Sequence, residues 1–439
     1  MIMEILKEII MDFQNQELET GTLRHLNYSF ISKKAFICIG VRRCGKSTFL
    51  YQIIEYLKKN KKVKAENIIY INFFDDRLTD LKKEGNLQLI LEAYFSIYPE
   101  KKNSEKIYCF FDEIQEVKDW EPFMDRLIRT ENCEVFLSGS SAKMLSKEIA
   151  SQMRGRSISW ELFPFSFREF LSYYKIDFQK LTSKNRLLVI KYFNEYFLKG
   201  GFPEIINQND KLRVMIHQEY YKTILHRDII ERFDAIHPQA IIQAAFRLIT
   251  NVSNSYSLNR ITENLKTLGF KISKEFVSSA INWFEDVYFL FSVKLYAKSI
   301  VKQNINTKKI YCVDHGLVSS IDPGIKEKLG YLLENIVFSY LRTKTDNIFY
   351  YRTKSGKEID FIILLDQKKY LVQVCYVLNN KKTASRETNA LWEALSETGI
   401  EKGIIVSNNE ENVFEDSGKK ILVIPAWKFL ITDLDELIK

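Results

Sequence analysis

The chain has 439 residues, of which 46% are hydrophobic and 27% are charged, and its formal net charge is +8. This composition is typical of a globular protein with two or three domains. The lysine pairs behind the mild positive charge allow nucleic-acid contact without requiring it. Six cysteines without a C-x-x-C pair argue against a disulfide framework or a zinc site and indicate free thiols in a reducing compartment.

No stretch of the sequence approaches the ~18 apolar residues that cross a bilayer. The first residues are interrupted by Glu4, Lys7 and Glu8, which is unlike the core of a signal peptide. We therefore expect a cytoplasmic protein without membrane contact. Residues 1–34 are expected to form a helical lead-in to the first domain.

A glycine-rich loop follows the apolar run 35–39 and precedes a segment with helical periodicity, 48–57. Strand, glycine loop and helix in this order form a phosphate cradle, because the loop N–H groups point inward and the helix N-terminus is partly positive. Lys46 is expected to reach the β- and γ-phosphates of ATP, and the Ser47 hydroxyl to coordinate Mg²⁺. The expected nucleotide-binding residues are Gly40, Val41, Arg42, Arg43, Cys44, Gly45, Lys46, Ser47 and Thr48.

An acidic strand end supplies the second half of the expected site. The apolar run 107–111 predicts a strand that is buried on both faces, and Asp112 and Glu113 follow it directly. Asp112 is expected to hold the Mg²⁺ ion, and Glu113 to act as the general base that polarises the attacking water. The alternative is a strand that ends in an ordinary acidic turn.

Two further groups complete the candidate site. The apolar run 135–137 ends in a serine-rich turn, where Ser138 or Ser140 is placed to sense the γ-phosphate. Arg154 and Arg156 precede another short strand, 157–162, and either guanidinium is a candidate arginine finger, in cis or from a neighbouring subunit. Solvated arginines and a plain serine turn are the structural alternatives.

The order of the elements predicts an α/β protein with three segments. Residues 1–165 alternate strands and helices, which is typical of a parallel sheet covered by helices on both faces. Residues 166–325 are mainly helical, and 257–293 predict two helices followed by the strands of a winged helix. The second of those helices, 274–285, has one lysine and no arginine, which favours docking to protein over reading of DNA. Residues 326–439 return to α/β.

The series of motifs along the chain resembles the AAA-like ATPases of bacteria and archaea that carry a C-terminal domain of uncharacterised function. The resemblance covers nearly the whole chain. It implies a sheet with an additional strand between the strands of the glycine loop and of Asp112, nucleotide binding at 40–48, and roles in Mg²⁺ binding and water activation for Asp112 and Glu113. The motifs are GVRRCGKST (40–48), FFDEIQ (110–115), LSGSS (137–141), RGR (154–156), FPFSFREFL (163–171), GGFPE (200–204), HRD (226–228), IYCVDHGL (310–317) and GKEIDF (356–361).

The third segment also resembles the core of restriction-endonuclease-type folds, in which carboxylates and a lysine surround a metal ion. The corresponding residues are Glu334, Asp360 and Gln373, but Cys375 stands in the lysine position. A thiol does not supply the fixed positive charge that phosphodiester cleavage needs. We therefore expect a binding domain without cleavage activity, with a lysine that has migrated from elsewhere, such as Lys354 or Lys357, as the exception.

These features predict an ATP-hydrolysing switch whose nucleotide state controls how the second and third segments engage a partner. A protein partner is favoured, nucleic acid is the alternative, and assembly into a homo-oligomer is open. The competing hypothesis is an ATP-driven, metal-dependent nuclease. A GTPase is disfavoured because no N-K-x-D motif is present, and a small-molecule kinase because Glu113 suits activation of water.

Overall fold

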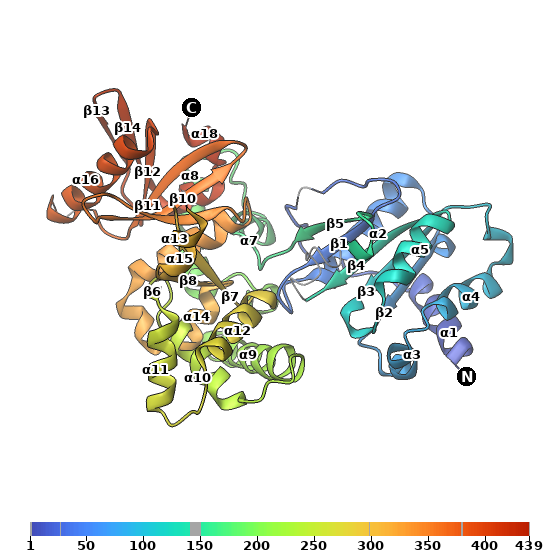
Figure 1. The fold of residues 1–439 in the computed structure, drawn as a ribbon. Helices are drawn as coiled ribbons and strands as arrows, with labels where there is room; N and C mark the ends of the chain where they lie inside the picture. Colours follow the sequence, from blue (N-terminus) through green and yellow to red (C-terminus); the bar gives the residue numbers. More distant parts are fainter. Residues whose placement is uncertain (1, 27, 141–150, 298, 379–380, 439) are drawn as a thin grey trace. The chain divides into compact units, whose positions relative to one another are not determined.

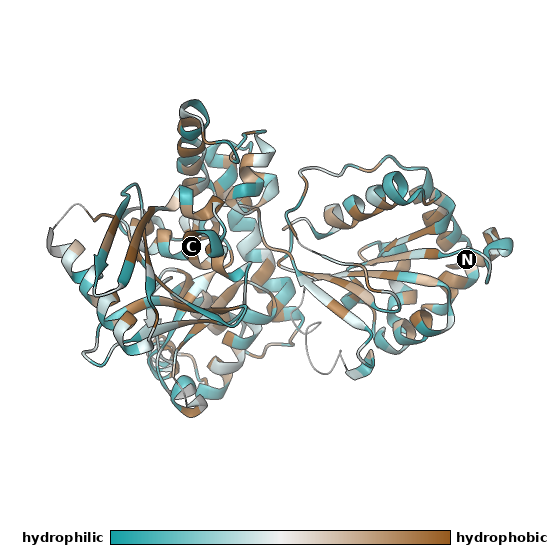
Figure 2. Ribbon diagram, turned by 90° about the horizontal axis from the view of Figure 1, so that it is seen from above, coloured by the Kyte–Doolittle hydropathy of each residue, from teal (hydrophilic) through white to brown (hydrophobic). Residues whose placement is uncertain are grey.

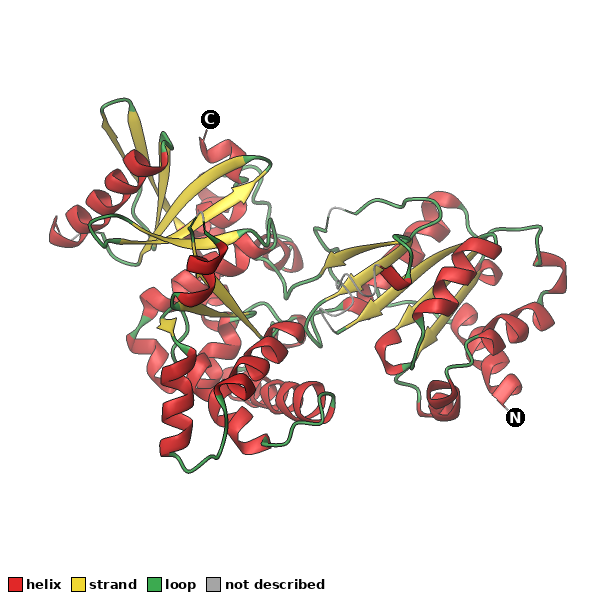
Figure 3. Ribbon diagram, viewed as in Figure 1, coloured by secondary structure: helices red, strands yellow, loops and turns green. Residues whose placement is uncertain are grey.

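The computed structural model describes residues 2–26, 28–140, 151–297, 299–378 and 381–438, and it divides into two compact units. The first unit comprises residues 1–163 with 286–288, and the second comprises 164–285 with 289–439. Figure 1 shows both units as ribbons, and Figure 3 distinguishes their helices and strands. Within the described residues, no helix is both long and apolar enough to cross a membrane.

The first unit is built on a five-stranded parallel sheet with the order β2-β3-β4-β1-β5 (Figure 1). Helices cover both of its faces, as the sequence predicted, and β4 lies between β1 and β3. The helical lead-in is shorter than predicted, because α1 ends at Asn15 and the described residues between it and β1 form no helix. The elements are α1 (Ile2–Asn15), β1 (Ala35–Ile39), α2 (Lys46–Lys61), β2 (Ile68–Asn72), α3 (Thr79–Glu84), α4 (Gln88–Ile97), β3 (Ile107–Asp112), α5 (Glu121–Thr130), β4 (Cys133–Gly139) and β5 (Ser157–Glu161).

Apolar residues occupy much of the neighbouring strands of this sheet (Figure 2), and their side chains are buried. All five residues of β1 are buried. Phe110 on β3 stacks on Phe136 of β4 at a ring distance of 4.4 Å, and Phe36 of β1 stacks on Trp160 of β5 at 4.5 Å. Burial of the sheet on both faces explains the continuous apolar runs of its strands. Because all five strands are parallel, their carboxyl ends meet at one edge of the sheet.

The second unit begins with helices and continues into a nine-stranded mixed sheet with the order β13-β14-β12-β11-β10-β9-β7-β8-β6. Its helices before the sheet are α7 (Phe167–Tyr173), α8 (Ser183–Lys199), α9 (Asp210–Thr223) with a π-helical continuation (Ile224–Glu231), and α10 (Pro238–Ile249). The next elements are β6 (Ser255–Tyr256), α11 (Leu258–Thr267), α12 (Lys274–Asp286), β7 (Leu290–Leu295), α13 (Ile300–Ile305), β8 (Lys308–Cys312) and α14 (His315–Ile321). The last elements are α15 (Leu329–Arg342), β9 (Ile348–Arg352), β10 (Glu358–Leu365), β11 (Lys368–Cys375), α16 (Lys381–Thr398), β12 (Lys402–Ser407), β13 (Asn412–Asp416), β14 (Lys419–Pro425), α17 (Ala426–Ile431) and α18 (Leu434–Ile438).

The nine-stranded sheet continues across residue 325, where the sequence predicted a domain boundary. Strand β7 pairs in parallel with β9, so Lys294 lies opposite Phe349 and Leu295 opposite Tyr350. The division into domains at 165/166 and 325/326 stays a prediction. What the pairing establishes is that residues on both sides of 325 contribute to one sheet.

Three of the sequence motifs meet inside the second unit and have structural roles there. Asp314 caps α14 by accepting the Leu317 N–H at 3.0 Å, and its other oxygen accepts the Gly201 N–H at 2.6 Å. A Cβ atom at Gly201 would lie 2.3 Å from the carbonyl oxygen of Phe165. These close approaches explain why glycine stands at position 201 in the motif at 200–204 and aspartate at position 314 in the motif at 310–317.

Candidate functional site

The phosphate loop connects β1 to α2 and depends on two glycines. Gly45 has φ 100° and ψ 26°, a left-handed conformation that favours glycine, and it directly precedes the first residue of α2, Lys46. At Gly40 a Cβ atom would lie 2.0 Å from the carbonyl oxygen of Leu162. The loop therefore curls tightly between strand and helix, as the motif predicted.

Lys46 lies inside this loop and is almost fully buried. Its Nζ donates to the carbonyl oxygens of Gly40 at 3.2 Å and Val41 at 3.3 Å, and it lies 3.4 Å from Oε1 of Glu113. Burial alone would lower the pKa of Lys46, but the negative charges of Glu113 and Asp112 outweigh it and raise that pKa. The ammonium therefore stays charged at the place where the loop bends.

Asp112 ends β3 and is fully buried at the carboxyl edge of the sheet. Its carboxylate accepts hydrogen bonds from the Tyr70 hydroxyl at 2.7 Å and from the Ser138 hydroxyl. Burial, followed by the charge of Glu113, raises the pKa of Asp112, and the hydroxyls of Ser138, Ser47 and Tyr70 oppose the rise. Ser47 and Asp112, the two expected Mg²⁺ ligands, therefore lie close enough for the Ser47 hydroxyl to lower the pKa of Asp112.

Glu113 follows in a left-handed conformation with φ 56°, so the chain turns sharply after the strand. Its Oε2 accepts the Gln115 side-chain amide at 2.6 Å, while its Oε1 faces Lys46. Burial would raise the pKa of Glu113, but Lys46, Gln115 and Arg42 together lower it below its usual range. The Glu113 carboxylate is therefore ionised near neutral pH, which is the state that a general base needs.

Ser138 links the two acidic residues. Its hydroxyl bonds the Asp112 carboxylate and accepts the backbone N–H of Glu113 at 3.0 Å. These bonds orient the acidic turn. The Ser140 hydroxyl instead accepts a hydrogen bond from the Gln115 side-chain amide at 3.4 Å. Which of the two serines contacts a γ-phosphate stays a prediction, and Ser141 of the same motif lies outside the described residues.

The two candidate arginines lie away from the chain's own phosphate loop. The Ala35 N–H at the start of β1 donates to the Arg156 carbonyl at 2.7 Å, whereas the loop follows the other end of β1. The Arg156 guanidinium bonds Asp125 at 2.6 Å, and Nε of Arg154 lies 3.7 Å from the same carboxylate. Since parallel strands place their starts at the opposite sheet edge from their ends, this geometry disfavours a finger that acts in cis.

Sequence reasoning missed two residues that hold the site in place. The Arg24 guanidinium donates to the carbonyl oxygen of Cys44 in the phosphate loop at 2.7 Å and to that of Phe163 at 2.6 Å. Tyr70 on β2 bonds Asp112 from the neighbouring strand. Arg24 lies in a segment without periodicity, and only the strand order identifies Tyr70, so neither had a usable local signal.

Comparisons with known proteins agree with this geometry. Residues 32–171 match the AAA domain family, and residues 190–328 and 329–429 match two domains of unknown function, DUF8612 and DUF4143. The uncharacterized protein MJ1544 of Methanocaldococcus jannaschii is 34% identical over 421 residues, which cover 93% of this chain and 91% of that protein. The chain belongs to the same family as MJ1544. An uncharacterized protein of Haemophilus influenzae is 27% identical over 391 residues, which cover 88% of this chain and 92% of that protein.

Solved structures show more distant likeness. The Walker-type ATPase PABY2304 of Pyrococcus abyssi has a TM-score of 0.38 at 14% identity over 72% of this chain and 95% of that one. AMPPCP-bound DnaA from Aquifex aeolicus has a TM-score of 0.25 at 16% identity over 64% of this chain and 86% of that one. Likeness at this level does not decide function. The match at 32–171 and the geometry of the loop identify the first unit as an AAA-type P-loop domain that binds ATP.

We predict that Lys46→Ala weakens ATP binding by roughly 10- to 100-fold, because it removes a charged donor to the phosphates. Isothermal titration with ATP measures the change. Lys59→Ala is the matched control, since Lys59 lies on the same helix with its side chain 76% exposed. Equal ATP affinity of the Lys46 variant and the control, with both folded by circular dichroism, would contradict this role.

Proposed function

We propose that this chain is an ATP-hydrolysing switch protein and that its AAA domain turns over ATP with Mg²⁺. The observation that supports it most is the convergence of Lys46, Asp112 and Glu113 at one buried edge, with Glu113 3.4 Å from the Lys46 ammonium. A phosphate-binding cation, a metal-binding carboxylate and an ionised base are the parts that hydrolysis of a phosphoanhydride requires.

The oxygen atoms present suit a magnesium ion, because Mg²⁺ prefers hard oxygen ligands and the Ser47 hydroxyl is close enough to the Asp112 carboxylate to lower its pKa. Ser47 and Asp112 would hold the ion, which supplies positive charge to the phosphate oxygens. Lys46 would orient the β- and γ-phosphates from inside the loop. Glu113 would then accept a proton from water at a carboxylate oxygen, once phosphate competes for the Lys46 ammonium.

The second unit offers surfaces for a protein partner. Strand β8 pairs antiparallel with β6 and β7, and α11 and α12 lie between β6 and β7 along the chain, which supports a winged-helix arrangement. On α12, Trp283 stacks on Phe233 at 5.1 Å and packs edge-on against Phe276, so aromatic rings occupy part of this helix. Together with the lack of arginine, this favours protein over DNA as its partner. Large apolar side chains are also exposed on or beside the preceding helices, at Leu187, Leu198, Met215, Ile236 and Phe246.

We also propose that the chain works in the cytoplasm and assembles with copies of itself. All six cysteines are free and buried, which suits a reducing compartment. Self-assembly is proposed because Arg154, whose side chain is 68% exposed, lies at the opposite sheet edge from its own phosphate loop. An arginine in that position is available to the nucleotide of a neighbouring subunit.

We predict that Glu113→Gln keeps ATP bound but lowers the hydrolysis rate by ~10²–10⁴-fold, because an amide does not take a proton from water. The two readouts are phosphate release and retention of radiolabelled ATP on the purified chain. Glu116→Gln is the control, since Glu116 is exposed and lies three residues further on. Turnover by the Glu113 variant at the unmodified rate would mean that another group is the base.

We predict that Arg154 acts in trans. A mixture of Arg154→Ala and Lys46→Ala chains should then recover part of the ATPase activity, because one mixed interface pairs an intact phosphate loop with an intact arginine. The measurement is activity against mixing ratio, with oligomer size followed by light scattering. If oligomers form and no ratio restores activity, Arg154 is not a finger in trans.

A further inference from the structure

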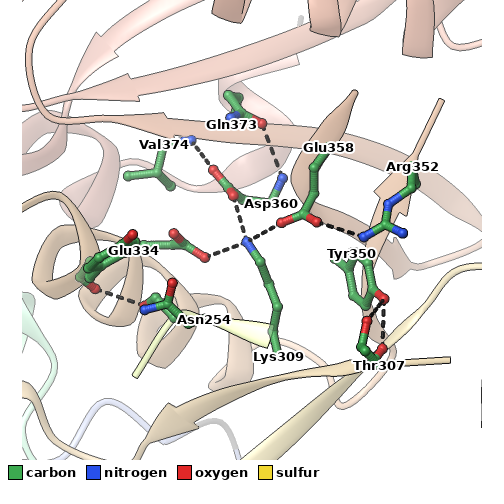
Figure 4. Close-up of polar contacts among 12 residues, drawn as sticks. Asn254, Thr307, Lys309, Glu334, Tyr350, Arg352, Glu358, Asp360, Gln373 and Val374 are labelled. Atoms are coloured by element: carbon green, nitrogen blue, oxygen red, sulfur yellow. Dashed lines mark hydrogen bonds and ion pairs between the residues drawn. The ribbon is translucent and has the colours of Figure 1, made fainter. Parts of the chain in front are cut away.

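A buried lysine lies at the centre of three carboxylates in the second unit (Figure 4). The Lys309 Nζ is 2.8 Å from Oδ1 of Asp360, 2.9 Å from Oε1 of Glu334 and 3.1 Å from Oε1 of Glu358. Lys309 is 4% exposed. An ammonium group has three N–H donors and here meets three carboxylate acceptors, so its hydrogen-bonding capacity is filled.

Glu334 and Asp360 are the residues that the nuclease-like pattern marked for a metal ion. Their elements follow that pattern, since α15 carries Glu334, β10 carries Asp360, and β10 pairs with β11, which carries Gln373. The lysine, however, comes from β8. Of the two lysines that the sequence suggested as migrated, Lys357 directs its ammonium to Glu393 at 3.0 Å.

The oxygens that would bind a metal ion are already engaged by protein donors. Oε1 of Glu334 accepts from Lys309 and from the Tyr311 hydroxyl at 2.6 Å. Oδ1 of Asp360 accepts from Lys309, and its Oδ2 accepts the Val374 N–H at 2.9 Å. Across the described residues, no group of three or more His, Cys, Asp or Glu side chains is arranged to hold a metal ion.

The remaining two positions of the nuclease pattern are also committed to the fold. The Gln373 side-chain oxygen accepts the Asp360 backbone N–H at 3.1 Å, and its amide donates to Glu387 at 2.8 Å. The Cys375 thiol donates to the Val377 carbonyl at 3.3 Å. A divalent ion therefore does not fit this cluster, because every expected ligand serves a hydrogen bond within the protein.

We propose that Lys309 is the permanent cation of this cluster: its ammonium takes the position of a divalent metal ion, and the nuclease-like region is a metal-independent module that does not cleave nucleic acid. The same lysine has a mechanical consequence. Lys309 lies on β8, and its partners lie on α15 and β10. Its ion pairs therefore link β8, which precedes residue 325, to elements that follow residue 325. This inference does not depend on the ATP site.

The test asks whether removal of the lysine creates a metal site. Lys309→Met keeps the length of the side chain but leaves the buried carboxylates of Glu334 and Asp360 without the lysine's charge, so its melting temperature should fall by on the order of 10 °C. In that variant, Mn²⁺ should raise the melting temperature again. Electron paramagnetic resonance should also detect protein-bound Mn²⁺. The double variant Lys309→Met with Asp360→Asn should lose both effects.

The control variant is Lys308→Met, because Lys308 is the neighbouring residue on β8 and is half-buried. All samples are the full chain without nucleotide, and metal binding that Asp360→Asn leaves unchanged belongs to other sites. The unmodified chain and its Asp360→Asn variant should bind Mn²⁺ equally. The unmodified chain should also not cleave DNA or RNA in the presence of Mn²⁺.

Two results would overturn the proposal. One is Mn²⁺ binding or nuclease activity in the unmodified chain that disappears in Asp360→Asn, because Lys309 would then yield its place to a metal ion. The other is a folded Lys309→Met variant that Mn²⁺ neither binds at Asp360 nor stabilises. If Lys309→Met does not fold, the comparison of the unmodified chain with Asp360→Asn alone decides.

Discussion

Buried charge is the constraint on which both parts of this structure depend. A lysine ammonium that leaves water must find carboxylates or carbonyl oxygens inside the protein, since an unpaired buried charge is strongly destabilising. Lys46 and Lys309 both meet this requirement, but in different ways. Lys46 uses two backbone carbonyls and one carboxylate at 3.2 to 3.4 Å, whereas Lys309 has three carboxylates at 2.8 to 3.1 Å.

This difference in pairing matches the difference in proposed role. The longer contacts of Lys46 are ones that phosphate oxygens can replace, which suits a residue that binds and releases nucleotide. The shorter and complete set around Lys309 leaves no donor for a ligand, which suits a fixed link between strands. We therefore propose a role in ATP binding for Lys46, whose ammonium has one carboxylate partner, and a structural role for Lys309, whose ammonium has three.

The sequence predicted the parts of this account that depend on neighbours along the chain. The glycine loop, the acidic end of β3 and the serine end of β4 are local patterns, and the parallel sheet brings them together because its strand ends share one edge. The role of Lys309 was not predictable in this way. Two of its three partners, Glu334 and Asp360, stand 25 and 51 residues away, and no local pattern marks them as neighbours of Lys309. The short edge strand β13 was also missed, because its charged sequence Asn412–Asp416 lacks an apolar pattern.

The most direct test of the central claim is the Mg²⁺ dependence of ATP hydrolysis by the purified chain, compared with Asp112→Asn. Our account predicts that the unmodified chain releases phosphate from ATP only with Mg²⁺. It also predicts that Asp112→Asn, which keeps the side chain's size but removes its charge, still binds ATP and loses this Mg²⁺-dependent turnover. Equal Mg²⁺-dependent phosphate release by both chains, or none by the unmodified chain at any Mg²⁺ concentration and in its assembled state, would contradict it.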